Sequence, residues 1–261
     1  MQRSPTAFPR LLALAPLSVL VFWSAPAHAQ DQGQDQDHVV VGLGASYGPA
    51  YDGADTYRVM PIPAIDVKKG RFFANFHDGV GLDVLESDHL TVGAGLVYMP
   101  GYRQQDVPKG VDRLKMGVGG RVFASLKEGG FVGTVGITQD IVGGTKGLIA
   151  DTSLSYPISV TDRFTVIPSI GASWANGKYN DGYFGVDRTE ATASGLAQFQ
   201  AGSGFKDASA MLTLSYRLTD RINLGVTGGV TSLLGDDQNS PLVVHKTGPM
   251  GFFSLSYRLG R

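Results

Sequence analysis

Few side chains in this sequence are spaced for acid–base or nucleophilic chemistry. Ser240, His245 and the pair Asp236-Asp237 fall in one polar stretch. A serine, a histidine and an acid can together form a hydrolytic triad. Their spacing here matches no hydrolase motif, so we interpret them as polar loop residues. We therefore expect no catalytic residue and no enzymatic activity.

Metal and cofactor chemistry has equally little support. Cysteine is absent from all 261 residues, so disulfides and thiolate metal sites are excluded. Four acidic residues of two polar stretches could collect a divalent cation: Asp52, Asp55, Asp236 and Asp237. Exposed acidic loop residues meet such cations without forming a dedicated site. We expect neither a metal site nor a cofactor.

Residues 1–29 have the layout of a cleaved secretion signal. Arg3 and Arg10 supply a basic start, Leu11–Trp23 is an apolar run, and Ala27-His28-Ala29 offers small residues for cleavage. The run is too short for a membrane-spanning helix, which needs about 20 residues. The formal net charge of −1 leaves no basic footprint for nucleic acid. The sequence therefore predicts an exported bacterial protein that does not bind nucleic acid.

The rest of the chain is predicted to form a short tail and one β domain. Residues 30–38 hold no apolar position before His38 and are expected to be a flexible periplasmic tail. From 39 to 261, apolar residues recur with a period of two, which is typical of strands with one apolar face. Twelve such stretches are expected, at Val39–Tyr47, Tyr57–Val67, Arg71–Phe76, Val80–Leu85, Leu90–Tyr98, Met116–Leu126, Phe131–Gln139, Leu148–Tyr156, Phe164–Trp174, Ala208–Leu218, Ile222–Leu234 and Met250–Leu259.

The connections between these stretches alternate between short and long. Lys68–Gly70 and Thr219–Arg221 are short, whereas Met99–Lys115, Ala175–Asp207 and Gly235–Gly248 are long. Short turns at one end and long loops at the other are the signature of outer-membrane barrels. The predicted fold is all-β: a closed antiparallel transmembrane β-barrel of about 12 strands (10–12), with both termini periplasmic. A soluble periplasmic β-sandwich is the alternative, but nothing in that fold requires short turns at one end and long loops at the other.

One part of the barrel is irregular in the sequence. Pro61 and Pro63 fall inside a predicted strand, where proline has no N–H for the ladder. His77–Gly79 is a tight connection at the end where the others are long. The strand count therefore depends most on residues 57–90.

Aromatic residues recur near both ends of the predicted strands. Tyrosines that end a Leu-Ser-Tyr triplet stand beside the short turns and predict a periplasmic girdle: Tyr156, Tyr216 and Tyr257. Aromatics at the opposite strand ends predict an outer girdle: Tyr47, Tyr98 and Trp174. Aromatic belts at both interfaces are typical of membrane barrels. Ordinary core packing in a sandwich is the alternative interpretation.

The opposite face of the strands is small and polar, with scattered charge. Six charged residues are candidate lumen groups: Asp83, Arg121, Asp151, Asp207, Arg217 and Arg258. They could tune the selectivity of an aqueous pore. Because both signs are present, pairing inside a narrow, largely filled lumen is the favoured interpretation.

The longest predicted loop, Ala175–Asp207, is rich in aromatic residues. Tyr183, Phe184 and Phe199 could plug the lumen or contact a partner outside the cell. Exposed aromatic side chains at a loop tip would be costly. Packing inward is therefore the favoured interpretation.

Several motifs together resemble the MipA/OmpV family of outer-membrane proteins. The most specific is the run Tyr179–Val186, which reads Tyr-Asn-Asp-Gly-Tyr-Phe-Gly-Val. Other matching motifs follow the same order along the chain: Val41-Gly42-Leu43-Gly44, Tyr47-Gly48-Pro49, Gly70-Arg71-Phe72-Phe73, Ser194-Gly195-Leu196, Thr219-Asp220-Arg221, Leu233-Leu234-Gly235-Asp236 and Ser240-Pro241. The chain departs from the family at its end, where no aromatic residue follows Arg258.

The resemblance implies a non-enzymatic scaffold in the Gram-negative outer membrane, in contact with lipid and lipopolysaccharide. Its name-giving member is described as linking a murein-degrading lytic transglycosylase to a murein-synthesising penicillin-binding protein. Other members are described as adhesion or porin-like proteins, so contact through outer loops and a small-solute channel stay open as alternatives. Partner contact is expected from the tail and from the turn residues Lys68, Lys69, Arg163 and Arg221.

Overall fold

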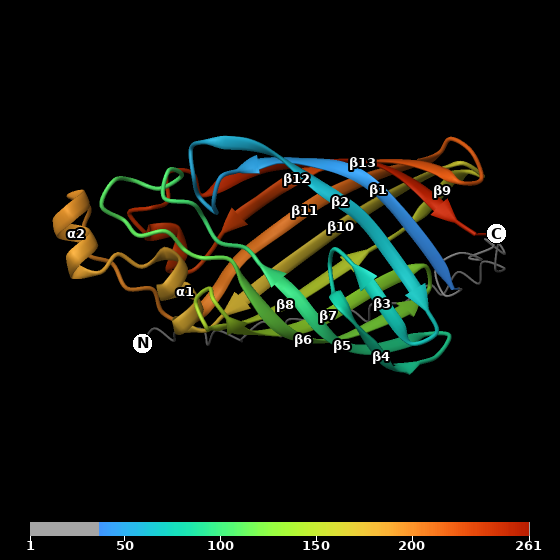
Figure 1. Cartoon of the computed structure of the whole chain (residues 1–261), viewed down its shortest axis with the longest axis horizontal. Helices are drawn as coiled ribbons and strands as arrows, with labels where there is room; N and C mark the ends of the chain where they lie inside the picture. The colour runs from blue at the N-terminus through green and yellow to red at the C-terminus, as the bar shows by residue number, and fades with distance from the viewer. Residues whose placement is uncertain (1–36, 261) are drawn as a thin grey trace, which may run out of the picture. The chain divides into compact units, whose positions relative to one another are not determined.

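The computed structural model describes residues 37–260. The predicted signal segment, and the predicted tail as far as residue 36, lie outside the described residues. Within 37–260, no helix has the length and apolarity needed to cross a membrane. These residues form one antiparallel sheet with two short helices at one of its ends (Figure 1).

Thirteen strands make up the sheet. They are β1 (His38–Pro49), β2 (Tyr57–Lys69), β3 (Phe72–Asn75), β4 (Gly79–Glu86), β5 (Leu90–Met99), β6 (Gly117–Glu128), β7 (Phe131–Val142), β8 (Leu148–Ser155), β9 (Ile158–Thr161), β10 (Phe164–Ala175), β11 (Gly204–Arg217), β12 (Ile222–Leu233) and β13 (Thr247–Leu259).

The sheet closes into a barrel of twelve strand positions. Neighbours in the order β1 to β8 pair with each other, and β8 pairs with β10. β10 pairs with β11, and β11, β12 and β13 pair in turn until β13 meets β1 and completes the ring. β8 and β9 lie one after the other against β10 and share one position, since the ladder is interrupted at Tyr156 and Pro157. The prediction of a closed antiparallel barrel of about 12 strands is confirmed. The stretch 157–163, expected to be a turn, instead contains β9.

The alternation of side chains explains why these segments form a barrel wall. On β6, Val118, Val122 and Leu126 are exposed on the outer face, whereas Arg121 and Phe123 are buried on the inner one. The same alternation runs through β11 and β13. The result is a ring of large apolar side chains outside and small or polar side chains inside, as a barrel in lipid requires.

The connections are short at one end of the barrel and mostly long at the other, as the sequence predicts. Five of them, 70–71, 87–89, 129–130, 162–163 and 218–221, are short and lie at what we call the short-turn end, together with the start of β1 and the end of β13. At the other end, the long-loop end, lie the loops 50–56, 100–116, 143–147, 176–203 and 234–246. The turn 76–78 joins β3 to β4, and these two strands are shorter than their neighbours.

The longest loop contains two helices that the period of two does not show. α1 (Gly177–Phe184) begins at Asn176, whose side chain accepts a hydrogen bond from Tyr179 N, and α2 (Arg188–Ser194) begins with a capping box between Asp187 and Glu190. Both caps are visible in the sequence as an acceptor side chain three residues before a bonded N–H. The 3-10 turn η1 (Asp237–Asn239) lies in the last loop.

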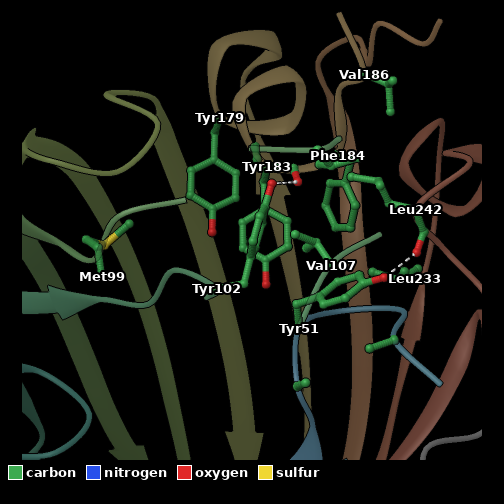
Figure 2. Close-up of a cluster of buried hydrophobic side chains, with 14 residues drawn as sticks. Tyr51, Met99, Tyr102, Val107, Tyr179, Tyr183, Phe184, Val186, Leu233 and Leu242 are labelled. Carbon is green, nitrogen blue, oxygen red and sulfur yellow. Dashed lines mark hydrogen bonds between the residues drawn. The ribbon is translucent and has the colours of Figure 1, made fainter. Parts of the chain in front are cut away.

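Four loops pack together over the long-loop end, and we call this assembly the cap: residues 50–56, 100–116, 176–203 and 234–246. Its core is aromatic, with Tyr51, Tyr102, Tyr179, Tyr183 and Phe184 all buried (Figure 2). Hydroxyl groups cross-link the loops. Tyr51 donates to the Leu242 carbonyl at 2.9 Å, and Tyr102 donates to the Tyr183 carbonyl at 3.2 Å.

Replacing the most buried aromatic residue of the cap tests its packing. Phe184→Ala leaves a cavity between Tyr183 and Leu242, and truncations of this kind cost about 3–5 kcal/mol. We expect the loops to be cleaved faster by protease while the heat-resistant barrel persists on gels. Val244→Ala is the matched control, since Val244 lies in the same cap but is exposed. Equal cleavage rates in the two variants would contradict this packing.

Candidate functional site

The lumen is crossed by ion pairs at three levels. The level nearest the short turns joins Lys68 of β2 to Asp83 of β4 and to Glu86, whose Oε1 lies 2.9 Å from the lysine Nζ. Lys68 and Asp83 are both well buried. A cavity of about 230 Å³ lies beside this level and is lined by polar groups together with Phe73 and Phe123.

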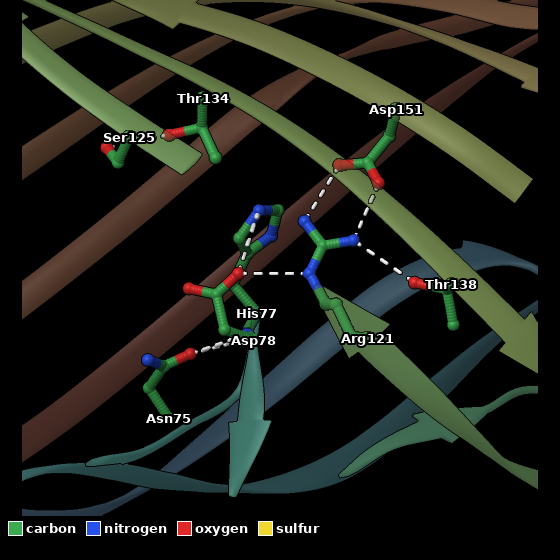
Figure 3. A network of polar contacts seen from close by, with 8 residues as sticks. All are labelled: Asn75, His77, Asp78, Arg121, Ser125, Thr134, Thr138 and Asp151. Carbon is green, nitrogen blue, oxygen red and sulfur yellow. Dashed lines mark hydrogen bonds and ion pairs between the residues drawn. The ribbon is translucent and has the colours of Figure 1, made fainter. Parts of the chain in front are cut away.

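Arg121 forms the middle level (Figure 3). Its guanidinium donates to both carboxylate oxygens of Asp151 on β8, at 2.6 and 2.9 Å, and to Thr138 at 3.2 Å. On its other side, Nε donates to Asp78, in the turn between β3 and β4, at 3.1 Å. The arginine therefore ties the short β3–β4 hairpin to the wall formed by β6 and β8.

Lys206 forms the third level, beneath the cap, and a β-bulge turns it inward. Ser173 pairs with Asp207 and Trp174 with Phe205, so Lys206 has no residue opposite it. Because of this extra residue, Lys206 and Asp207 both face the interior. The lysine Nζ lies 2.6 Å from Asp207 and 2.7 Å from Asp52 of the cap.

Asp237 is a buried carboxyl group that these pairs do not satisfy. Its side chain is fully buried, and neither oxygen has a hydrogen-bond partner. Burial, the largest cause, raises the pKa of Asp237 to about 7, although Lys206 acts in the opposite direction. Burial likewise raises the pKa of Tyr179 to about 12 and the pKa of Tyr183 well above its ordinary value, so both hydroxyls stay neutral.

The residues considered for hydrolysis are not assembled into a triad. The Ser240 hydroxyl donates to the Phe184 carbonyl at 2.6 Å, so it is committed to holding the cap. His245 is exposed, and no hydrogen bond joins it to Ser240 or Asp237 among the described residues. Within 37–260, no group of three or more histidine, aspartate or glutamate side chains is placed to hold a metal ion.

The other expected site residues take three kinds of place. Tyr183 and Phe184 are buried in the cap, and Phe199 packs against it. Asp83, Arg121, Asp151 and Asp207 belong to the ion pairs of the lumen. Arg217 is the last residue of β11 and Arg258 the second-last of β13, and both are exposed at the short-turn rim.

The aromatic residues expected in two girdles lie at opposite ends of the outer wall. Near the short turns, Tyr156, Tyr216 and Tyr257 are each about 40% exposed. Near the long loops, Tyr47 and Tyr98 are more than half exposed, and Trp174 is partly exposed. Sequence reasoning missed the cations Lys68 and Lys206, which complete two of the three lumen levels.

Comparison with known families decides the relationship that these features suggest. The family described as "MltA-interacting protein MipA" matches residues 41–259. The chain belongs to this family. An MltA-interacting protein from Escherichia coli (strain K12) is 27% identical over 248 residues, which cover 89% of this chain and 92% of that protein.

Two further relatives have names that state their location. Outer membrane protein OmpV of Vibrio cholerae is 32% identical over 180 residues, 66% of this chain and 63% of that protein. A 24 kDa outer membrane protein of Pasteurella multocida is 23% identical over 217 residues, 78% of this chain and 84% of that protein. Among solved structures, the NanC porin superimposes with a TM-score of 0.46 at 12% identity, covering 85% of this chain and all of that one. The protein is an outer-membrane β-barrel of the MipA family.

The buried carboxyl of Asp237 makes the cap sensitive to pH. Because the pKa of Asp237 in the closed cap, about 7, is above its ordinary value of 3.8, the closed cap favours the protonated form. The contribution of Asp237 to the stability of the closed cap is therefore fully present below about pH 4 and is lost as the pH rises to about 7. We expect loop proteolysis to accelerate over this range in the native protein and to stay flat in Asp237→Asn. Asp55→Asn, at an exposed acid of the same cap, should behave like the native protein; a flat native profile would contradict the assignment.

Arg121 can be tested as the cation on which the middle level depends. Arg121→Met leaves Asp78 and Asp151, which are partly buried, without their cation. Breaking a fully buried pair costs about 3–5 kcal/mol, so we expect a smaller loss here. We expect the urea midpoint of unfolding to fall, and to recover largely when Asp78→Asn and Asp151→Asn are added. Ser125→Ala, on the same face of β6, is the control. A midpoint for Arg121→Met equal to that of the control would show that the pairs do not stabilise the barrel.

Proposed function

We propose that the protein is a non-enzymatic scaffold of the outer membrane that holds murein-remodelling enzymes through its short-turn end. Membership of the MipA family supports this proposal, as does the E. coli relative whose name describes interaction with MltA. The partners proposed are a lytic transglycosylase and a penicillin-binding protein. Residues 1–29 are proposed to be a cleaved signal that exports the chain.

The short-turn end is proposed to face the periplasm. In bacterial outer-membrane barrels the short turns are periplasmic and the longer loops are extracellular. This orientation places both ends of the barrel, His38 and Leu259, on the periplasmic side. It also places Tyr156, Tyr216 and Tyr257 at the periplasmic interface and the cap outside the cell.

An arc of exposed arginines carries the proposal. Arg163 lies in the turn before β10 and Arg221 in the turn before β12. Arg217 ends β11, and Arg258 is the second-last residue of β13. Backbone bonds of 2.8 Å from Arg217 N to Arg163 O and from Arg258 N to Arg221 O keep them in adjacent pairs. All four side chains are exposed. Arginine is enriched at protein interfaces, where its planar fork binds carboxylates.

The structure also refines which other residues belong to this surface. Lys68 faces the lumen and pairs with Asp83 and Glu86, so it is removed from the proposed contacts, whereas Lys69 is exposed. Asp37 accepts a hydrogen bond from Gly70 N at 2.7 Å, so it lies at this rim. A stable interface needs about 800 Å² on each partner, which is more than the turns alone offer. The predicted tail is therefore proposed to contribute to the contact.

The two other candidate functions have less support. Tyr183 and Phe184 are buried in the cap, so these aromatic groups are not presented for adhesion. A small-solute channel would have to pass three levels of ion pairs and the closed cap.

Charge reversal of the arginine arc tests the scaffold. Arg163→Glu with Arg221→Glu should weaken binding of the host's lytic transglycosylase about tenfold at low salt, because like charges then meet an acidic partner surface. The loss should shrink as salt rises. Binding would be measured by biolayer interferometry with the purified barrel in detergent.

Arg113→Glu with Arg188→Glu is the matched control, since it reverses two exposed charges at the long-loop end. A separate variant lacking residues 30–36 measures the contribution of the tail. The proposed surface is wrong if the arc variant, the tail deletion and the control all bind like the native protein.

A further inference from the structure

One part of the barrel wall lacks strand pairing. β3 covers only the stretch Asp66–Lys69 of β2, and β4 pairs with β5 only as far as Leu96. Within the described residues, 57–65 of β2 therefore pair only with β1, and 97–99 of β5 only with β6. We call these two stretches the unpaired edges. They lie between the β3–β4 hairpin and the long-loop end (Figure 1).

The backbone of β2 is adapted to being unpaired. Ala50 N donates to Thr56 O at 2.8 Å, and the register of β1 and β2 continues from this bond without a shift. The backbone N–H and C=O groups of even-numbered β2 residues therefore bond to β1. Those of odd-numbered residues are directed towards the unpaired side. Pro61 and Pro63 are both odd-numbered, so their missing N–H groups fall on the free edge. Proline at such positions keeps another strand from closing the wall.

Between Arg58 and Asp66, the lumen-facing side of this wall is apolar. Met60, Ile62 and Ala64 lie there on the same face as Lys68. On β13, Met250 and Phe252 have the same inward register, and Met250 is 42% exposed. The wall formed by β6 to β8 instead carries Arg121, Thr138 and Asp151. The lumen is thus apolar on one side and ionic on the other.

Ion pairs mark both limits of the unpaired edges. Towards the long loops, Arg58 of β2 donates to Asp106 of the loop 100–116 at 2.8 Å. Towards the short turns, the hairpin is held by Asp78 and Arg121. Ion pairs therefore hold the two edges at their ends, and no backbone ladder joins them in between. A small molecule could separate them there without breaking backbone hydrogen bonds.

We propose that the unpaired edges form a lateral access route between lipid and lumen, taken by amphiphilic molecules with an apolar chain and a cationic head. The chain would lie on Met60, Ile62 and Phe252. The head would meet the ionic side, where Asp78 and Asp151 outnumber Arg121, and Asp83 and Glu86 outnumber Lys68. This route is separate from scaffolding at the short-turn rim, and neither proposal depends on the other.

The absence of cysteine makes a site-specific probe simple. A nitroxide attached at Ile62→Cys would report on the apolar side of the lumen at the unpaired edge. Ser153→Cys is the lumen-facing control, since β8 pairs there with both β7 and β10. Ile170→Cys is the lipid-facing control, because Ile170 is 60% exposed on the outer wall.

Electron paramagnetic resonance of the labelled protein in liposomes gives the first test. Collisions with oxygen, which concentrates in lipid, should be as frequent at position 62 as at position 170, and rare at position 153. Collisions with an aqueous nickel chelate should be most frequent at position 153. An oxygen accessibility at position 62 equal to that at position 153 would overturn the route.

Two probes of equal chain length then test the ligand class. Dodecylamine should broaden the spectrum of the label at position 62 and leave the label at position 153 unchanged. Dodecanoate should have a much weaker effect at position 62, because its head is repelled by the acidic lumen. Equal effects of the two probes, or none from either, would overturn the assignment of a cationic amphiphile.

Discussion

A strand that crosses a membrane must find a hydrogen-bond partner for nearly every peptide group, because lipid supplies none. Here the ladder from β11 through β13 and β1 to β8 returns to β11 through β10. Once the ring is closed, every side chain must face either lipid or lumen. A slip of one residue would exchange the two faces, so the register with which β10 meets β11 also decides which charges are buried.

The same constraint explains two of the places where the wall departs from regularity. At Lys206 one extra residue brings a cation inside that the alternation would leave in lipid, and Asp52 and Asp207 then balance its charge. At the unpaired edges fewer backbone groups need a hydrogen-bond partner, because Pro61 and Pro63 have no N–H. Both departures are local, and the ladders beside them stay in register.

The sequence predicts the barrel well because the period of two is a strong signal that recurs along the chain. Boundaries such as those of β5 and β12 follow from it within a residue or two. The lumen was less predictable. Asp83 and Arg121 stand out as inward charges, but Asp78, which pairs with Arg121, lies in the turn of a hairpin whose length no periodicity gives, and Lys68, which pairs with Asp83, falls in a predicted turn. Lys206 was missed because a bulge reverses its face. The capping box of Asp187 and Glu190 was readable, but α1 and α2 were obscured by a loop with no period of its own.

The two ends of the barrel use their side chains in opposite ways. At the long-loop end, aromatic rings pack together and hydroxyl groups bond within the cap. Tyr51 donates to the Leu242 carbonyl, Tyr102 to the Tyr183 carbonyl, and Ser240 to the Phe184 carbonyl. At the short-turn end, four exposed arginines lie in turns and near strand ends, and Arg221 among them also donates to the Tyr257 hydroxyl. Exposed charged groups cost little in water and attract partners over about 10 Å, whereas buried aromatic groups attract none. This difference supports the proposal that recognition takes place at the short-turn rim and that the cap closes the other end.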